Sequence, residues 1–391
     1  MDSFYRPTRV EISLDALQHN INAFQQKLPD SIRIMAVVKA DAYGHGAVEV
    51  SKEAVRCGVD YLAVAFLDEA LELRSAGITA PILALGYTPP DGLSVALQHD
   101  ITINVYSQEV LEALKVLKSD TKNLKIHIKL DTGMGRLGLQ TGPDAIAFIE
   151  EALQLPGVEV EGLFTHYANA DEIDKSYTLE QYRRMERVVQ YFKEKGVEFT
   201  YLHAGNSAAA IDLPGLTYNM ARLGISMYGL YPSNEVNVNA LELKPVLTLK
   251  TGVVHLKTLP PDSGISYGTI YHTKDEEQIA TLPIGYADGY SRMLTQKAEA
   301  LIHGHKVPVV GRICMDQCMI RVSDVQQAKT GDEVVLIGEQ GGQRITVEDV
   351  ARMLNTINYE ITCMISHRVP RIYMREGRQV EAVNPLSRHR N

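Results

Sequence analysis

Short apolar runs recur through the first part of the chain, separated by segments with helical periodicity. Seven runs rich in Val, Ile and Leu are Ile34–Val38, Tyr61–Ala65, Ile82–Leu85, Ile101–Val105, Leu124–Leu130, Val158–Phe164 and Phe199–His203, and an eighth begins near Met220. Between them lie stretches such as Leu67–Arg74 and Leu179–Lys195, whose apolar residues recur at helical spacing. Alternating strands and helices are typical of parallel βαβ units. The pattern predicts a TIM-like (βα)8 barrel over residues 12–238, with a doubly wound open sheet as the alternative.

The pattern changes after Pro232. Strand-like runs then follow with turn residues between them: Val246–Leu256, Gln278–Leu282, Leu301–Val310 and Glu333–Ile337. One helical stretch, Thr346–Leu354, begins with a threonine suited to capping. We therefore predict a second, mostly β domain over residues 239–391. The N-terminal strand within residues 1–11, around Thr8–Ile12, is expected to join its edge.

Composition narrows the class of protein. The 391 residues include 39 Lys and Arg against 48 Asp and Glu, for a net charge of -9, and 45% are hydrophobic. An acidic balance opposes binding to phosphate backbones and anionic lipids, so nucleic acid and membrane partners are not expected. The N-terminus has no apolar run typical of a secretory signal, and no stretch is long enough to span a membrane. We expect a cytoplasmic protein.

The four cysteines, Cys57, Cys314, Cys318 and Cys363, lack paired C-x-x-C spacing. We expect buried thiols and no metal site, since a chain of this length can stabilise its fold without disulfides or structural zinc.

Lys39 is the first candidate for chemistry because it directly follows the strand-like run Ile34–Val38 and precedes a glycine-rich turn. In a barrel, reactive side chains lie at the C-terminal ends of strands. A partly desolvated lysine can form a Schiff base with a carbonyl. Position alone also fits a solvated lysine at a strand end, so the residue pattern leaves both readings open.

Seven ordered motifs together resemble the alanine racemase family. They are A-V-V-K-A-D-A-Y-G-H-G at 36–46, K-L-D-T-G-M-G-R-L-G at 129–138, H-A-G-N-S-A-A at 203–209, R-L-G-I-S-M-Y-G at 222–229, S-Y-G at 266–268, G-R-I-C-M-D-Q-C at 311–318 and T-I-N-Y-E at 356–360. They run almost from end to end of the chain. This makes the resemblance far more specific than one glycine-rich loop.

The resemblance implies an isomerase that interconverts L-alanine and D-alanine and supplies D-alanine for peptidoglycan. Lys39 would carry pyridoxal 5'-phosphate, and the substrate would react as an external aldimine of this cofactor. Racemisation removes a proton on one face and returns it on the other. The resemblance assigns these steps to two bases, Lys39 and Tyr267.

The resemblance also implies a homodimer with shared active sites. In the family, the residue matching Tyr267 comes from the partner subunit, together with the segment Cys314–Asp316. Met315 and Asp316 would bind the substrate there. On residue type alone, Tyr267 and Met315 also fit core positions.

Four further residues are implied to control the reaction. Arg222 would face the pyridine nitrogen, where an arginine keeps its proton and leaves that nitrogen unprotonated. His166 would support Arg222. Arg136 would bind near the cofactor's phenolic oxygen and the substrate carboxylate. Lys129 matches a lysine that is carbamylated in several family members, although an ordinary ammonium is equally compatible with the sequence.

The phosphate site is implied to combine hydroxyl and backbone N–H donors. These donors belong to Tyr43, Ser207, Gly224, Ile225 and Tyr359. Ser207 opens a run of small residues, so a plain helix cap is the alternative role for it.

Three other functions share part of this pattern. Pyridoxal-phosphate homeostasis proteins share the barrel and the lysine but lack the β domain that carries Tyr267. Barrel-type decarboxylases place a carboxylate where this chain has Arg222. Serine or broad-specificity racemases differ around the substrate pocket, where Tyr359 matches the bulky residue of alanine-type sites.

Overall fold

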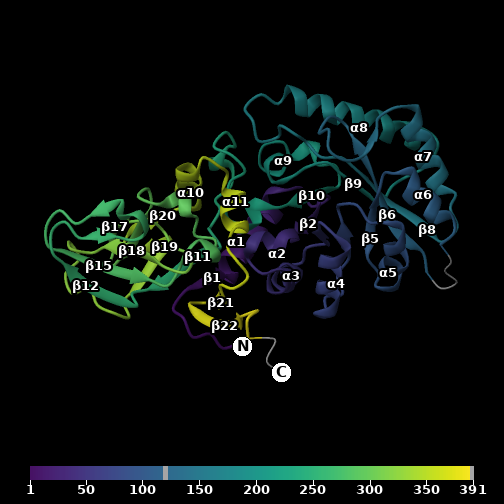
Figure 1. The fold of residues 1–391 in the computed structure, drawn as a ribbon. Coiled ribbons are helices and arrows are strands. Elements are labelled where there is room, and N and C mark those ends of the chain that lie inside the picture. The colour runs from purple at the N-terminus through teal and green to yellow at the C-terminus, as the bar shows by residue number, and fades with distance from the viewer. Residues whose placement is uncertain (118–121, 388–391) are drawn as a thin grey trace. The chain divides into compact units, whose positions relative to one another are not determined.

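The computed structural model describes residues 1–117 and 122–387 and divides into two compact units (Figure 1). One unit, here called the barrel unit, comprises Ala16–Ala42 and Ala47–Lys244. The other, here called the sheet unit, comprises Met1–Asp15, Tyr43–Gly46 and Pro245–Asn391.

The barrel unit contains eight parallel strands in the order β10-β2-β3-β4-β5-β6-β8-β9. Their bounds are β2 (Arg33–Val37), β3 (Tyr61–Val64), β4 (Ile82–Ala84), β5 (Thr102–Val105), β6 (Leu124–Asp131), β8 (Val158–Phe164), β9 (Tyr201–His203) and β10 (Met220–Leu223), and the two-residue β7 (Leu139–Gln140) pairs with β6. Backbone hydrogen bonds connect the first and last strands, from Asn219 N to Leu202 O at 3.2 Å and from Arg222 N to Gly205 O at 3.0 Å. The predicted (βα)8 barrel is confirmed, and the open-sheet alternative is wrong.

Helices lie outside these strands, as Figure 1 shows for α4 to α8. The helices are α1 (Leu14–Lys27), α3 (Ala47–Arg56), α4 (Leu67–Ser75), α5 (Leu93–Gln98), α6 (Gln108–Lys115), α7 (Pro143–Leu153), α8 (Ser176–Glu194) and α9 (Ser207–Asp212). In α8, Met185, Val188 and Phe192 are buried. Their spacing of three and four residues places them on the face that packs against the barrel.

The segment after β2 has an unusual backbone. In α2 (Lys39–Gly44), Ala40, Asp41, Ala42 and Tyr43 have φ between 52° and 54°, so this turn is left-handed. A left-handed conformation costs L-residues roughly 1–2 kcal/mol each. Such strain persists only where the surrounding structure enforces it, and it is common at functional sites. Lys39 is the first residue of this turn.

The sheet unit is built on an eleven-stranded sheet in the order β12-β15-β18-β17-β16-β19-β11-β1-β21-β22, with β20 paired to β19. The strands are β1 (Arg9–Ser13), β11 (Leu247–Gly252), β12 (His255–Leu259), β15 (Glu277–Leu282), β16 (Glu299–Ile302), β17 (His305–Val310), β18 (Cys318–Arg321), β19 (Glu333–Gln340), β20 (Gln343–Ile345), β21 (Arg371–Arg375) and β22 (Arg378–Val383). A separate hairpin pairs β13 (Gly264–Ile265) with β14 (Tyr271–His272).

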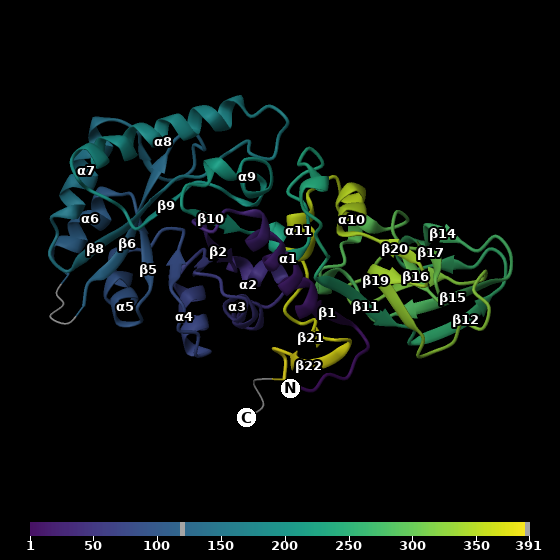
Figure 2. The ribbon, with the colours of Figure 1, turned by 180° about the vertical axis from the view of Figure 1, so that it is seen from behind.

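The N-terminal strand lies inside this sheet, so its expected place at the edge is wrong. β1 pairs antiparallel with β11 and parallel with β21. Buried and partly exposed residues alternate along β1, with Val10 and Ile12 fully buried. This alternation shows that one face of the strand is covered, but it does not show whether a neighbouring strand lies on one side or on both. The N-terminus lies beside β22 (Figure 2), where Asp2 N donates to Ala382 O at 2.8 Å.

Two predicted long strands are each divided in two. Val246–Leu256 becomes β11 and the start of β12, which pair with different neighbours, β19 and β15. Leu301–Val310 becomes the hairpin β16–β17, because His303 and Gly304 have φ of 49° and 78°. Two successive positive φ values are typical of a tight hairpin turn.

The helix predicted at Thr346–Leu354 is confirmed as α10 (Val347–Leu354), and α11 (Asn358–Cys363) follows it. Thr346 Oγ1 accepts from Asp349 N at 3.0 Å, and Asp349 Oδ2 accepts from Thr346 N at 2.9 Å. This reciprocal pair is a capping box, which fixes the first turn of the helix.

The expectation of buried thiols is confirmed only for Cys318. Cys57 and Cys314 are half-buried, and Cys363 is exposed. Within residues 1–117 and 122–387, no helix combines the length and apolar character needed to cross a membrane. The same residues contain no cluster of three His, Cys, Asp or Glu side chains that could hold a metal ion.

Candidate active site

The C-terminal ends of the barrel strands carry most of the predicted site residues. Lys39 follows β2, Lys129 lies near the end of β6, His166 follows β8, Ser207 follows β9, and Arg222 lies in β10. Since all eight strands are parallel, these ends meet at one rim of the barrel, here called the barrel mouth.

Arg222 is almost completely buried and donates to four acceptors. Nη1 donates to His203 Nδ1 at 2.8 Å, and Nη2 donates to His166 Nδ1 at 3.0 Å. Nη2 also lies 2.9 Å from the carbonyl oxygens of Thr165 and Ala204. Burial lowers the pKa of Arg222 to about 10, which still leaves the guanidinium charged near neutral pH.

The two histidines that contact Arg222 are neutral acceptors. Burial, followed by the positive charge of Arg222, holds the pKa of both His166 and His203 well below the usual range. The contact between His166 and Arg222 agrees with the arrangement expected from the sequence. His203 was not singled out there, although it opens the quoted motif at 203–209 and ends a strand.

Lys129 lies close to several cations. Its side chain is buried, with Nζ 5.5 Å from the centre of the Phe164 ring. Burial lowers the pKa of Lys129 to about 8, and the charges of Arg136, Arg222 and Lys39 act in the same direction. A mouth that collects four basic side chains suits an anionic ligand.

Ser207 is buried, and its Oγ accepts hydrogen bonds from Gly224 N at 2.9 Å and Ser226 N at 3.4 Å. The alternative role of Ser207 as a helix cap is wrong, because Asn206 Oδ1 accepts from Ala209 N and caps α9. The Gly224 N–H is bonded to Ser207 here, so its expected bond to a phosphate stays a prediction. Ile225 begins the short 3-10 helix Ile225–Tyr228.

Tyr43 and Tyr359 lie together in the sheet unit, with ring centroids 6.1 Å apart. Tyr43 is buried, whereas Tyr359 is half-buried in α11. Burial, together with the nearby Tyr359 and Cys363, raises the pKa of Tyr43 well above its usual value. Tyr43 therefore keeps its hydroxyl proton at neutral pH and can act as a donor.

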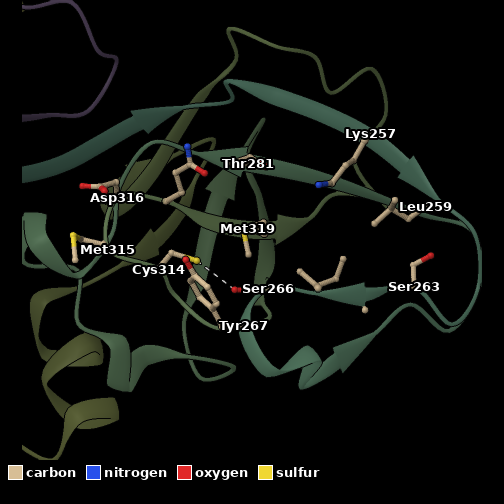
Figure 3. Close-up of a pocket in the computed structure, with 13 residues that line it drawn as sticks. Lys257, Leu259, Ser263, Ser266, Tyr267, Thr281, Cys314, Met315, Asp316 and Met319 are labelled. Atoms are coloured by element: carbon tan, nitrogen blue, oxygen red, sulfur yellow. Dashed lines mark hydrogen bonds between the residues drawn. The ribbon is translucent and has the colours of Figure 1, made fainter.

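Tyr267, Met315 and Asp316 line one hollow of about 700 Å³ on the sheet unit, here called the Tyr267 hollow (Figure 3). Tyr267 is 70% exposed and Met315 is 53% exposed. The neighbouring Ser266 has φ of 65°, and its Oγ donates to Arg312 O at 2.7 Å. This strained, hydrogen-bonded turn holds Tyr267 outward.

The loop with Met315 and Asp316 is anchored from the interior of the sheet unit. Asp316 forms an ion pair of 2.6 Å with Arg368, whose Nε donates at 2.8 Å to the buried Asp288. The Met315 carbonyl accepts from Ala287 N at 3.0 Å. An added Cβ on Gly285 would lie 2.3 Å from the Cys314 carbonyl, so the close approach of these two loops requires glycine.

Comparisons with known proteins match both units. The family model for the alanine racemase N-terminal domain matches residues 12–232, and the model for the alanine racemase C-terminal domain matches residues 246–373. Alanine racemase 2 of Caldanaerobacter subterraneus is 47% identical over 97% of this chain and 98% of its own length.

Solved structures agree with the sequence relatives. The structure of alanine racemase from Bacillus anthracis with bound L-Ala-P has a TM-score of 0.93 and 45% identity, covering 98% of this chain and 99% of that chain. Alanine racemase from E. faecalis has a TM-score of 0.90 and 41% identity, covering 96% and 100%. Because these matches extend through the barrel unit and the sheet unit alike, the chain belongs to the alanine racemase family.

Proposed function

We propose that this chain interconverts L-alanine and D-alanine with pyridoxal 5'-phosphate bound at Lys39. The observation that carries the proposal is the positive charge at the barrel mouth. Burial lowers the pKa of Lys129 there, and the charges of Arg136, Arg222 and Lys39 lower it further. The cofactor's phosphate and phenolic oxygen, and the carboxylate of alanine, are the anions that such a mouth accommodates. The residues present therefore fit the cofactor.

The proposed binding residues divide by the part of the cofactor they serve. Lys39 would hold it covalently. The phosphate would be bound by the hydroxyls of Tyr43, Ser207 and Tyr359 and by the backbone N–H groups of Gly224 and Ile225.

Arg222 would face the pyridine nitrogen, and its two neutral histidine neighbours leave the positive charge on the guanidinium. Because an arginine keeps its proton, it would leave that nitrogen unprotonated. Arg136 binds near the phenolic oxygen and the substrate carboxylate, where its fork of donors suits an oxyanion.

When bound, pyridoxal 5'-phosphate withdraws electrons from the amino acid and makes the Cα proton removable. Lys39 and Tyr267 are proposed to move this proton, Lys39 on the face of D-alanine and Tyr267 on the face of L-alanine. A single positioned base is worth roughly 10² to 10⁴ in rate. Two opposed bases let a proton leave from one face and return on the other without the substrate turning over.

We further propose a homodimer in which each active site receives Tyr267, Met315 and Asp316 from the partner subunit. The exposure of Tyr267 and Met315 in an open hollow supports this arrangement, since large apolar side chains displayed together mark interaction surfaces. Closed two-fold symmetry would then create two equal sites from one interface.

Alanine is the proposed substrate because the relatives are named alanine racemases and one of them contains L-Ala-P. The D-alanine produced would serve peptidoglycan synthesis. A serine or broad-specificity racemase is less favoured, since none of the compared names points to it.

Lys129 is proposed to react as the neutral amine with carbon dioxide, releasing one proton and forming a carbamate that pairs with Arg136. Carbamylation needs the neutral amine. With a pKa of about 8, about one molecule in ten carries that amine at pH 7, against about one in 3,000 for an ordinary lysine.

The test of the proposed function is the attachment of the cofactor. The purified protein should absorb visible light, and borohydride should fix the cofactor irreversibly on Lys39, as peptide mapping would show. Lys39→Ala should remain folded but lose both the covalent cofactor and racemisation. Lys52→Ala, an exposed lysine paired with Glu49, is the matched control and should keep both. A cofactor mapped to another lysine would overturn the proposal.

A further inference from the structure

A continuous line of buried hydrogen bonds runs through the interior of the barrel unit and ends at Arg222. Glu161 on β8 lies 3.2 Å from His127 Nε2 on β6. His127 Nδ1 lies 2.8 Å from His203 Nε2 on β9, and His203 Nδ1 lies 2.8 Å from Arg222 Nη1 on β10. We call these four residues the Glu161 relay; each of them is at most 6% exposed.

The direction of every hydrogen bond in the relay follows from Arg222. A guanidinium only donates, so His203 Nδ1 accepts and the proton of the neutral ring lies on Nε2. His203 Nε2–H therefore donates to His127 Nδ1, which leaves the proton of His127 on Nε2. That proton is donated to the Glu161 carboxylate, which accepts when ionised. The whole relay has one consistent set of tautomers.

Both histidines can stay neutral while Glu161 stays charged. Burial lowers the pKa of His127, and burial together with Arg222 lowers that of His203. Burial alone would raise the pKa of Glu161, but hydrogen bonds from His127 and Lys125 outweigh it and hold the value at about 2. The relay thus has an anion at one end and a cation at the other.

The other groups that face Glu161 complete its surroundings. Lys125 Nζ lies 3.0 Å from Oε1, and the Tyr61 hydroxyl donates to Oε2 at 2.9 Å. The Tyr61 hydroxyl also contacts Thr102 Oγ1 at 2.5 Å, and the ring of Tyr201 lies 5.8 Å from that of His127. The carboxylate is therefore held firmly in place at the end of the relay away from Arg222.

The backbone is shaped to hold the histidine rings. A Cβ added to Gly162 would lie 2.7 Å from His127 Nδ1, so the glycine provides the space that the ring occupies. The Phe164 ring stacks on His203 with centroids 4.6 Å apart and planes 11° apart. These contacts fix both rings and so fix the path between Glu161 and Arg222.

The direct contacts of Arg222 are neutral acceptors. In the part of the chain that the structure describes, no carboxylate forms an ion pair with this buried guanidinium. A buried charge without compensation is costly. The neutral rings of His127 and His203 connect Arg222 to the Glu161 carboxylate.

We propose that Glu161 is a positioning residue for Arg222, acting through His127 and His203. The carboxylate makes His127 a better acceptor for His203, and His203 in turn a better acceptor for Arg222, because hydrogen bonds in a chain polarise one another. The relay thereby orients the guanidinium and supplies its counter-charge without touching it. This inference rests on the proposed function in assigning Arg222 to the cofactor's pyridine nitrogen.

Glu161→Gln tests the relay because it keeps the size and an acceptor oxygen but removes the charge. Lys125→Met is the matched control, since it removes a different contact of the same carboxylate and leaves Tyr61 and His127 bound to it. The variants are compared as full-length holoenzyme in alanine racemisation and by 15N NMR of histidine-labelled protein with and without cofactor. Individual histidine substitutions assign His127 and His203 among the twelve histidines.

In the wild type, both rings should carry their proton on Nε2 in either form of the protein. Glu161→Gln should move the resonance of His203 Nδ1, the atom that accepts from Arg222, although Glu161 does not touch His203. It should lower kcat by about tenfold and change KM for alanine less than twofold, the size seen when outer-shell carboxylates behind histidines are removed. Lys125→Met keeps the charge of Glu161 and its contact with His127. It should therefore change kcat less than twofold and shift the His203 signal much less than Glu161→Gln does.

An unshifted His203 Nδ1 signal in Glu161→Gln, or equal effects of the two variants, would overturn the relay. If Glu161→Gln does not fold, Glu161→Asp is the second variant. It keeps the carboxylate charge but places it one methylene farther from His127, and it should shift the His203 Nδ1 resonance in the same direction. A positive Lys39 result with no Glu161 effect would refute this inference alone, whereas a failed Lys39 test with a shifted His203 signal would refute the proposed function alone.

Discussion

Replacing Lys129 by methionine should stabilise the protein. Methionine keeps most of the length of the side chain but carries no charge. Lys129 is 5% exposed, and burial, with the charges of Arg136 and Arg222, lowers its pKa from 10.5 to about 8. A lowered lysine pKa means that the folded state binds this proton less tightly than the unfolded state does.

The size of the effect follows from that shift. One pKa unit corresponds to 1.36 kcal/mol, so a protonated Lys129 costs the folded state about 3 kcal/mol. Below pH 8 the lysine is charged in both states, and the whole cost is present. Between pH 8 and 10.5 only the unfolded state holds the proton, so the cost declines and vanishes near pH 10.5. Lys129→Met should therefore raise the free energy of unfolding by about 3 kcal/mol at pH 7 and by little near pH 10.

Urea unfolding of the protein without cofactor, at one chain concentration and several pH values, measures this difference. Buffers free of carbon dioxide keep Lys129 as the amine or ammonium. Added 13C-bicarbonate should then stabilise the wild type and give a carbamate signal in the 13C NMR spectrum, and it should do neither in Lys129→Met. Lys125→Met on the same strand is the control. Its hydrogen bond to Glu161 raises the pKa of Lys125, so its loss should destabilise the protein.

A Lys129→Met variant that is no more stable than the wild type at pH 7 would refute the reasoning about the buried ammonium. A gain that does not shrink as the pH rises towards 10 would refute its electrostatic origin. A stabilised variant with no carbamate in the wild type would leave the electrostatic account standing and reject the proposed carbamylation.

Three further predictions concern the bases, the shared site and the barrel interior. Tyr267→Phe should slow racemisation by at least about 10² while the cofactor still binds, and near-normal turnover measured by polarimetry would remove Tyr267 from the mechanism. Mixing Lys39→Ala with Tyr267→Phe should restore about a quarter of wild-type activity, because half of the randomly exchanged dimers are mixed and each mixed dimer has one intact site of two. If subunit exchange is demonstrated and no activity returns, both bases lie in one chain. Gly162→Ala should lower the free energy of unfolding by about 1–3 kcal/mol in urea titrations, since its Cβ would lie 2.7 Å from His127 Nδ1; an unchanged stability would mean that the ring moves freely.

The barrel strands were predictable because most of them are short buried runs. Strands covered on both faces are apolar throughout, and β3 and β4 are buried at every position. The hairpin β16–β17 was missed because a single turn, His303 and Gly304, separates two apolar strands. The sheet position of β1 could not be predicted, since its partners β11 and β21 lie more than 200 residues along the chain.

The candidate site was predictable only through the family resemblance, which covers Arg222 inside a quoted motif and His166 outside the motifs. Arg222 and His166 were expected near one another, and the structure places them 3.0 Å apart. His127 and Glu161 were missed because polar residues inside a strand normally indicate its solvent face. In β6 and β8 these two side chains instead point into the barrel and satisfy one another. The close glycine at 162 is the sequence signal that could have marked the site, since a glycine within a strand allows a side chain to approach the backbone.

Arg222 and Lys129 are two buried basic residues at the barrel mouth that differ in their charge state. Burial lowers both pKa values, to about 10 and about 8. The usual pKa of an arginine is higher than that of a lysine, so Arg222 remains charged at neutral pH, as its proposed place facing a ring nitrogen requires. The lysine instead yields a neutral amine in a substantial fraction of molecules. The proposed carbamylation of Lys129 would therefore depend on the same burial and repulsion that leave Arg222 charged. Exchanging the two residue types would place the permanent hydrogen-bond donor at position 129 and the modifiable amine at position 222.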